Sequence, residues 1–97
     1  MDALIRQAIV DKRIVEFVYK GHSRIAELHI YGKKRGVLQV LAYQIGGGSS
    51  KGGLPEWRRF DLPEMRNLQM SIATFPGARE YHSMHSSWDE KYLIVAS

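Results

Sequence analysis

The sequence AYQIGGGSSKGGLPEWRRF occupies residues 42–60 and has the pattern of a β-hairpin. A strongly apolar strand runs into a loop rich in glycine and serine, and a strand with aromatic and arginine side chains follows it. The hairpin would gather two aromatic rings and two guanidinium groups around one loop, those of Tyr43, Trp57, Arg58 and Arg59. No obvious catalytic group stands nearby, so this stretch favours a small β-barrel that binds a ligand.

The apolar pattern predicts a helix ahead of this hairpin and strands on both sides of it. Residues 2–11 carry apolar side chains at helical spacing, and Asp2 is the expected N-cap. Alternating apolar residues predict strands over residues 14–19, 24–31, 37–45, 57–62 and 67–72.

Two of these strands bear on where the core lies. The strand over residues 37–45 is apolar on both faces, as expected for a central strand with covered sides. Strict alternation along residues 24–31 puts Ile30 on the same face as Leu28 and Tyr31 on the opposite face.

One helix followed by five short antiparallel strands makes the chain mainly β with an N-terminal helix. The expected architecture is a small five-stranded antiparallel barrel, or a strongly bent sheet, with the helix over one end or face. Residues 1–75 would form this unit, and residues 76–97 would be a C-terminal extension. Within the extension, residues 88–95 fit either a helical turn or a sixth strand.

Length and composition indicate a single domain. The 97 residues include no cysteine, which excludes disulfides and thiolate metal sites and is compatible with a reducing compartment. Neither a secretory signal nor a membrane-spanning apolar run is visible, so we expect a cytoplasmic protein that does not enter a membrane. The net charge of +4 permits an anionic partner without requiring one.

The order and spacing of several segments resemble the WYL domain family, and its short stand-alone members most closely. The resemblance covers residues 4–75. Its first pieces are the helix at Leu4–Ile9, VEFVY at Val15–Tyr19 with the Gly21 turn, and RIAE at Arg24–Glu27, where the family has Arg-x-x-Glu-Pro. Its later pieces are LAY at Leu41–Tyr43 and WRRFDL at Trp57–Leu62. It implies an Sm-like barrel that senses a ligand, often a nucleic acid or nucleotide, usually within larger bacterial transcription regulators. This chain shows no helix-turn-helix of its own.

The chain departs from the family's pattern at three places. Leu38-Gln39-Val40 stands where the name-giving Trp-Tyr-Leu tripeptide would be, Leu28 replaces the usual proline, and Glu64 falls where the family often has a second arginine. These departures leave open whether the usual ligand pocket is kept.

Arg58 and Arg59 point to opposite faces of a regular strand, so one would face the ligand surface and the other solvent. A guanidinium offers a planar fork of donors that suits phosphate. The alternative is an ion pair inside the protein, with Glu27, Glu56 or Asp61 as the partner.

Three further residues are candidates for ligand binding. Arg24 stands at the family's arginine position, and a structural salt bridge is an equally open role for it. Alternation puts Arg24 on the face opposite to Glu27, so these two residues are not expected to pair. Tyr43 and Trp57 flank the glycine-rich loop, where they would either stack on a base or pack at the mouth of the barrel.

We expect no catalysis, no cofactor and no metal. No nucleophile stands next to a base, and the glycine-rich loop lacks the Gly-Lys-Ser/Thr of a phosphate-binding P-loop, so it is expected to be a plain hairpin loop. His82, His85 and Asp89 have the spacing of metal ligands on a helix, but the residues around them are poor helix formers.

The sequence therefore predicts a non-enzymatic ligand-binding or regulatory module. It would recognise an anionic ligand, either a nucleotide or single-stranded nucleic acid, through Arg24, Tyr43, Trp57, Arg58 and Arg59. The alternative is a protein-interaction or self-assembly module with a diverged, non-functional ligand pocket. In that case residues 92–95 would add a strand to a protein partner or to a second copy in a homo-oligomer.

Overall fold

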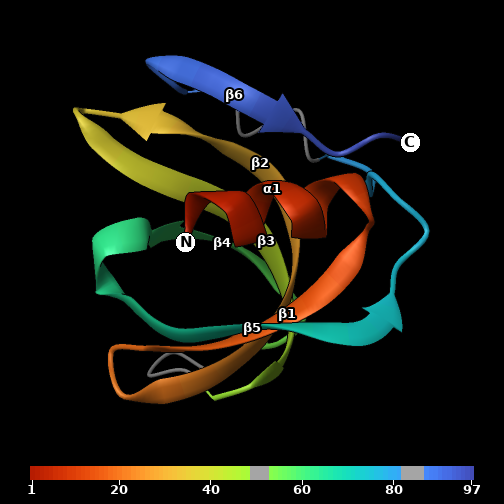
Figure 1. Cartoon of the computed structure of the whole chain (residues 1–97). Helices are drawn as coiled ribbons and strands as arrows, with labels where there is room; N and C mark the ends of the chain where they lie inside the picture. Colours follow the sequence, from red (N-terminus) through yellow and green to blue (C-terminus); the bar gives the residue numbers. More distant parts are fainter. Residues whose placement is uncertain (49–52, 82–86) are drawn as a thin grey trace.

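A computed structural model of the chain describes residues 1–48, 53–81 and 87–97. Within these residues the chain is mainly β, with an N-terminal helix and six strands in one antiparallel sheet (Figure 1). The elements are α1 (Asp2–Val10), β1 (Arg13–Tyr19), β2 (His22–Lys34), β3 (Val37–Gly47), β4 (Glu56–Asp61), the 3-10 turn η1 (Leu62–Glu64), β5 (Met65–Thr74) and β6 (Glu90–Ile94). The predicted helix and five strands are all present, and the stretch left open between helix and strand contains β6.

The sheet is open, so the predicted closed barrel is wrong, and the sheet is not strongly curled either. Its strands follow the order β4-β3-β2-β1-β5, and among the described residues the end strands β4 and β5 do not pair with each other. Between them the chain turns through η1, where Pro63 has no N–H to continue a ladder. After this turn β5 pairs with β1, on the opposite side of the sheet from β4.

Strand β2 is the centre of the sheet. Its first half pairs with β1, its second half pairs with β6, and β3 runs along its other edge. Its residues are buried without interruption from Ala26 to Gly32. Strand β3, which the sequence suggested as a central strand, is internal too, between β2 and β4, and is buried on both faces at Val40–Ala42, but the buried run of β2 is longer.

A register shift in β2 changes which side chains enter the core. The pairing of β2 with β3 shifts between Leu28 and Ile30, so the alternation of faces moves by one residue at this point. As a result Tyr31, and not Ile30, joins Leu28 in the main apolar cluster. Ile30 is buried outside this cluster, and the prediction from strict alternation is wrong for both residues.

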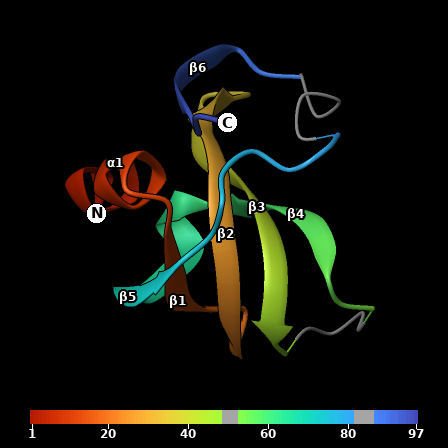
Figure 2. The same cartoon turned by 90° about the vertical axis from the view of Figure 1, so that its right-hand side faces the viewer.

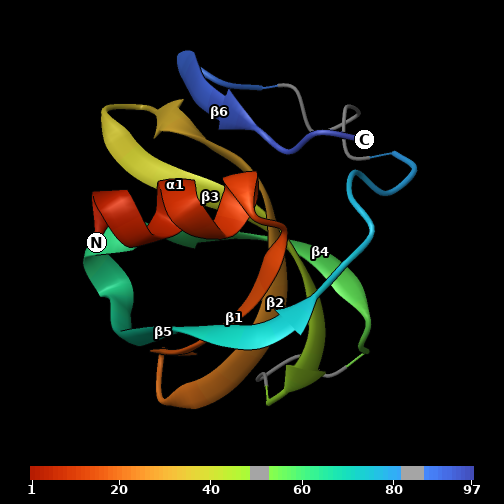
Figure 3. The ribbon, with the colours of Figure 1, turned by 45° about the vertical axis from the view of Figure 1, so that its right-hand side comes forward.

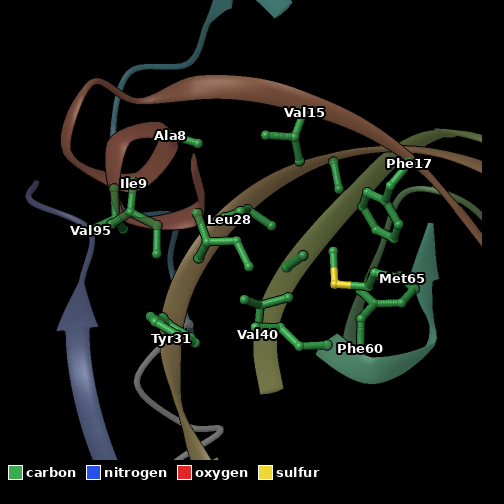
Figure 4. Close-up of a cluster of buried hydrophobic side chains, with 14 of the residues drawn as sticks. Ala8, Ile9, Val15, Phe17, Leu28, Tyr31, Val40, Phe60, Met65 and Val95 are labelled. Atoms are coloured by element: carbon green, nitrogen blue, oxygen red, sulfur yellow. The ribbon is translucent and has the colours of Figure 1, made fainter. Parts of the chain in front are cut away.

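Helix α1 covers one face of the sheet (Figure 3). It buries Ile5, Ala8 and Ile9 against side chains that point inward from the strands, as the close-up in Figure 4 shows for Ala8 and Ile9. Asp2 does not cap the helix, because the N-cap position is Met1. The Asp2 carboxylate instead accepts a hydrogen bond of 2.7 Å from the Tyr31 hydroxyl.

The chain beyond β5 passes over β2 before it reaches β6 (Figure 2). This segment contributes Phe75 to the apolar core and brings Arg79 to Glu27, which alternates with the inward-pointing Ala26 and Leu28. The sheet is therefore covered by α1 on one face and contacted by the C-terminal segment on the other. Among the described residues, no helix has the length and apolar character to cross a membrane.

The Tyr31–Asp2 contact predicts a loss of stability at alkaline pH. Burial, and then the hydrogen bond to the Asp2 carboxylate, raise the pKa of Tyr31 to about 12. The folded state therefore favours the neutral phenol, and the resulting stability is complete below pH 10 and disappears as the pH rises through 12. Between those pH values we expect the wild type to lose about 2 kcal/mol more unfolding free energy than Tyr31→Phe. Urea unfolding at both pH values measures this, and equal losses in the two proteins would contradict it.

Candidate functional site

The five residues that the sequence predicted to bind a ligand lie on two different faces of the sheet. In the register of β3 with β4, Ala42 pairs with Arg58, so Arg58 lies on the face of the apolar core. The same register pairs Tyr43 with Trp57, and both lie on the opposite face. The structure therefore brings Arg24 and Arg58 together, and it separates them from Tyr43, Trp57 and the side chain of Arg59.

Arg24 and Arg58 border a pocket of about 330 Å³ at one end of the core. Aromatic residues form part of its wall, together with four basic residues and one acidic residue. The lining includes Tyr19, Lys20, Arg24, Glu56, Arg58 and Phe60.

Arg24 is the most unusual residue in this pocket, because its charge is buried without a carboxylate partner. The residue is 5% exposed. Its Nη1 donates to Oε1 of Gln44 at 3.2 Å and its Nη2 to the backbone oxygen of Tyr19 at 3.0 Å. Among the described residues no carboxylate lies within ion-pair distance of it, and its Nε has no acceptor.

The surroundings of Arg24 disfavour its charge. Burial, and then the neighbouring charge of Arg58, lower the pKa of Arg24 below its ordinary value. The rings of Tyr19 and Phe60 each lie 5.6 Å from the guanidinium carbon, which offers partial compensation. A buried cation held mainly by neutral acceptors is costly for the fold, and an anion placed in the pocket would compensate it.

Local backbone geometry sets the position of Arg24 and its acceptor. Gly47 pairs with Arg24 and has a φ of +84°, and a Cβ at this position would lie 2.2 Å from the backbone oxygen of Ser23. Only glycine allows β3 to approach β2 so closely here. The Gln44 amide donates to the backbone oxygens of Gly46 and Gly48 at 3.0 and 3.1 Å, and these bonds turn its Oε1 toward Arg24.

Arg58 meets a carboxylate from its own strand. Its Nη2 lies 2.7 Å from Oε2 of Glu56, which stands two residues earlier and therefore on the same face of β4. The sequence offered Glu27, Glu56 and Asp61 as ion-pair partners for Arg58 or Arg59, and the structure shows the pair of Arg58 with Glu56.

Tyr43 and Trp57 pack together on the opposite face, with ring centroids 5.1 Å apart and planes at 61°. Trp57 also meets His29 edge-on at 4.8 Å. The guanidinium of Arg59 lies over Trp88 at 4.1 Å from the ring centroid. Although Trp57 and Arg59 also border the pocket of Arg24, these contacts hold their ring and guanidinium on the other side of the sheet.

The sequence analysis missed Arg79, which organises this second face. Arg79 binds both carboxylate oxygens of Glu27, at 2.7 and 2.8 Å, and its guanidinium lies 4.5 Å from the Tyr43 ring centroid. The hydrogen bonds to Glu27 raise the pKa of Arg79. Its backbone N–H also donates to Nε2 of His29 at 3.3 Å. Glu27 and His29 in an apolar strand do signal a need for polar partners, but nothing local in the sequence points to a residue 52 positions away.

Parts of two sequence predictions fall outside the described residues. His82 and His85 lie there, so the expectation that they hold no metal stays untested. The same holds for residues 49–52 of the glycine-rich loop.

Comparison with known proteins found no relative of this chain. No family model matches the chain, and neither a curated protein nor a solved structure shows significant similarity to it. The resemblance to the WYL domain family therefore stays a prediction from the sequence.

The contrast between Arg24 and Arg79 predicts that their substitutions differ in their effect on the free energy of unfolding. Arg24→Met removes a buried charge that has no carboxylate partner, which offsets the loss of two hydrogen bonds, so we expect a change within about 1 kcal/mol. Arg79→Met leaves the carboxylate of Glu27, a residue only 2% exposed, without its cation. Because the Arg79 side chain is itself half exposed, we expect a loss of about 2 kcal/mol rather than the larger value of a fully buried pair.

Urea unfolding at pH 7 measures both changes. The double variant Glu27→Gln/Arg79→Met is the control, since it removes both charges and should recover part of the loss. If Arg24→Met costs as much as Arg79→Met, Arg24 is a structural cation and not a group held ready for an anion.

Proposed function

We propose that this chain is a non-enzymatic module that binds an anionic ligand, a nucleotide or single-stranded nucleic acid, in the pocket of Arg24 and Arg58. The observation that carries the proposal is the burial of Arg24 without a carboxylate partner among the described residues. A buried charge without a counter-charge is a poor source of stability, so its presence favours a role in binding.

The chemistry of the pocket suits phosphate. Arg24 and Arg58 line one cavity together with Lys20, whose ammonium nitrogen lies 5.6 Å from the ring centroid of Tyr19. Guanidinium donors match the spacing of phosphate oxygens, and each contact is stronger inside a partly buried pocket than in open water. Nε of Arg24 would gain an acceptor from such a ligand.

The resemblance to WYL domains supports the same residue, because Arg24 stands at the position of that family's Arg-x-x-Glu-Pro arginine. Tyr43 and Trp57 have no base-stacking role in this proposal, because their rings pack together on the opposite face, where Trp57 also contacts His29.

The assembly alternative has less support. It rested on residues 92–95 as a strand for a neighbouring molecule, but Leu93 and Ile94 pair with Tyr31 and Ile30 of the same chain. No described contact favours a protein partner over a ligand.

Anion binding predicts a response to salt and to two substitutions. Fluorescence anisotropy with labelled single-stranded DNA and RNA, at about 50 and about 200 mM salt, should show weaker binding at the higher concentration. Arg24→Gln and Arg58→Gln should each weaken binding by roughly tenfold or more, since each removes a charged donor from the pocket.

Arg66→Gln is the matched control, because Arg66 is exposed on β5, lies outside the pocket and carries the same charge. The affinity of this variant for the labelled strands should stay close to that of the wild type, apart from a small effect of the lower net charge. Equal losses in all three variants would show non-specific attraction to a basic protein, and an absence of binding at micromolar concentrations would rule out the proposed ligand class.

A further inference from the structure

The pocket of Arg24 and Arg58 already contains an anion of its own, the carboxylate of Glu56. Oε2 of Glu56 lies 2.7 Å from Nη2 of Arg58, and both side chains border the same cavity. The Glu56 side chain is 47% exposed, so it reaches the pocket from the solvent side and is able to leave without disturbing the core. In the register of β3 with β4, Glu56 pairs with Gln44, the residue that also binds Arg24.

The two guanidinium groups of the pocket are therefore in different states. Arg58 has a carboxylate in contact, whereas Arg24 is held by the neutral oxygens of Gln44 and Tyr19. An anion that enters to compensate Arg24 meets the negative charge of Glu56 in the same small space. It has to coexist with that charge or take its place on Arg58.

This geometry favours ligands that carry two negative charges on one group. A singly charged anion, such as an internal phosphodiester of a nucleic acid, would exchange one negative charge for another at Arg58 and leave Arg24 uncompensated. A terminal phosphate carries close to two charges at neutral pH and three acceptor oxygens, which is enough for both guanidinium groups. The cavity of about 330 Å³ is at the small end of the range for ligand pockets and suits one terminal nucleotide.

We infer that the pocket takes a dianionic phosphate monoester, either a free mononucleotide or the phosphorylated end of a single strand, and that this phosphate displaces Glu56 from Arg58. The inference rests on the proposed anion-binding function. Glu56 acts as an internal competitor in it: the pocket stays partly neutralised when empty, and it rejects weakly charged anions in favour of the phosphate monoester.

The inference is tested with adenosine 5′-monophosphate and with two oligonucleotides of the same sequence, one carrying a 5′-phosphate and the other a 5′-hydroxyl. Isothermal titration calorimetry compares the wild type with Glu56→Gln, which keeps the shape of the side chain and removes its charge. The control is Glu90→Gln, an equal change of charge at an exposed residue of β6 outside the pocket.

We expect the wild type to bind the 5′-phosphorylated strand roughly tenfold more tightly than the 5′-hydroxyl strand. Glu56→Gln should bind the monophosphate roughly tenfold more tightly than the wild type, and should discriminate less between the two strands, because the competing charge is gone. Glu90→Gln should match the wild type in both respects.

The failures of the two proposals can be told apart. If both strands bind equally and binding still depends on Arg24, the preference for a phosphate monoester is overturned and anion binding stands. If Glu56→Gln binds the monophosphate less tightly than the wild type, Glu56 positions Arg58 for the ligand, and the displacement is overturned. If neither protein binds any of the three ligands, the proposed function fails, and this inference fails with it.

Discussion

Strand β2 pairs with three other strands along its two edges, and the rest of the structure depends on this pairing. β3 takes one edge, while β1 and β6 divide the other. The division requires β6 to approach closely at Gly32, where a Cβ would lie 2.2 Å from the backbone oxygen of Glu90. In the pairing of β2 with β3, a register shift near His29 sends Tyr31 into the core and toward Asp2 on α1. One strand thus ties the helix, the sheet and the C-terminal segment together.

The two faces of the sheet handle buried charge in different ways. On the side of the C-terminal segment, Glu27 is matched by the two-pronged contact of Arg79, and the pair is complete. On the side of α1, Arg24 receives neutral oxygens only. The first arrangement is what a stable fold requires, since a buried charge without its partner is expensive. The second is the arrangement on which the proposed binding of an anion rests.

Local patterns predicted most of the elements, because the period of apolar residues depends only on neighbours in the sequence. They did not predict the open sheet, which depends on where β5 pairs after the turn at Pro63. Alternation correctly put Arg58 and Arg59 on opposite faces, but assigning Arg58 to the pocket needed the pairing with Ala42. Local patterns did not predict Arg79 as the partner of Glu27, because Arg79 lies 52 residues away in a segment without a periodic pattern.

The adjacent arginines of β4 have an evolutionary consequence. If an insertion or deletion in the preceding loop moved β4 by one residue along β3, Arg59 would take the place of Arg58 and a guanidinium would still face the pocket. The same slip would pull Phe60 away from Phe17 and Tyr19, whose rings now lie 4.9 and 4.8 Å from it. Such a change of loop length would thus keep a guanidinium at the pocket but would disrupt the packing of the core around Phe60. The fit of one aromatic ring keeps the alignment, and descendants of this chain should vary the loop only in ways that leave Phe60 where it is.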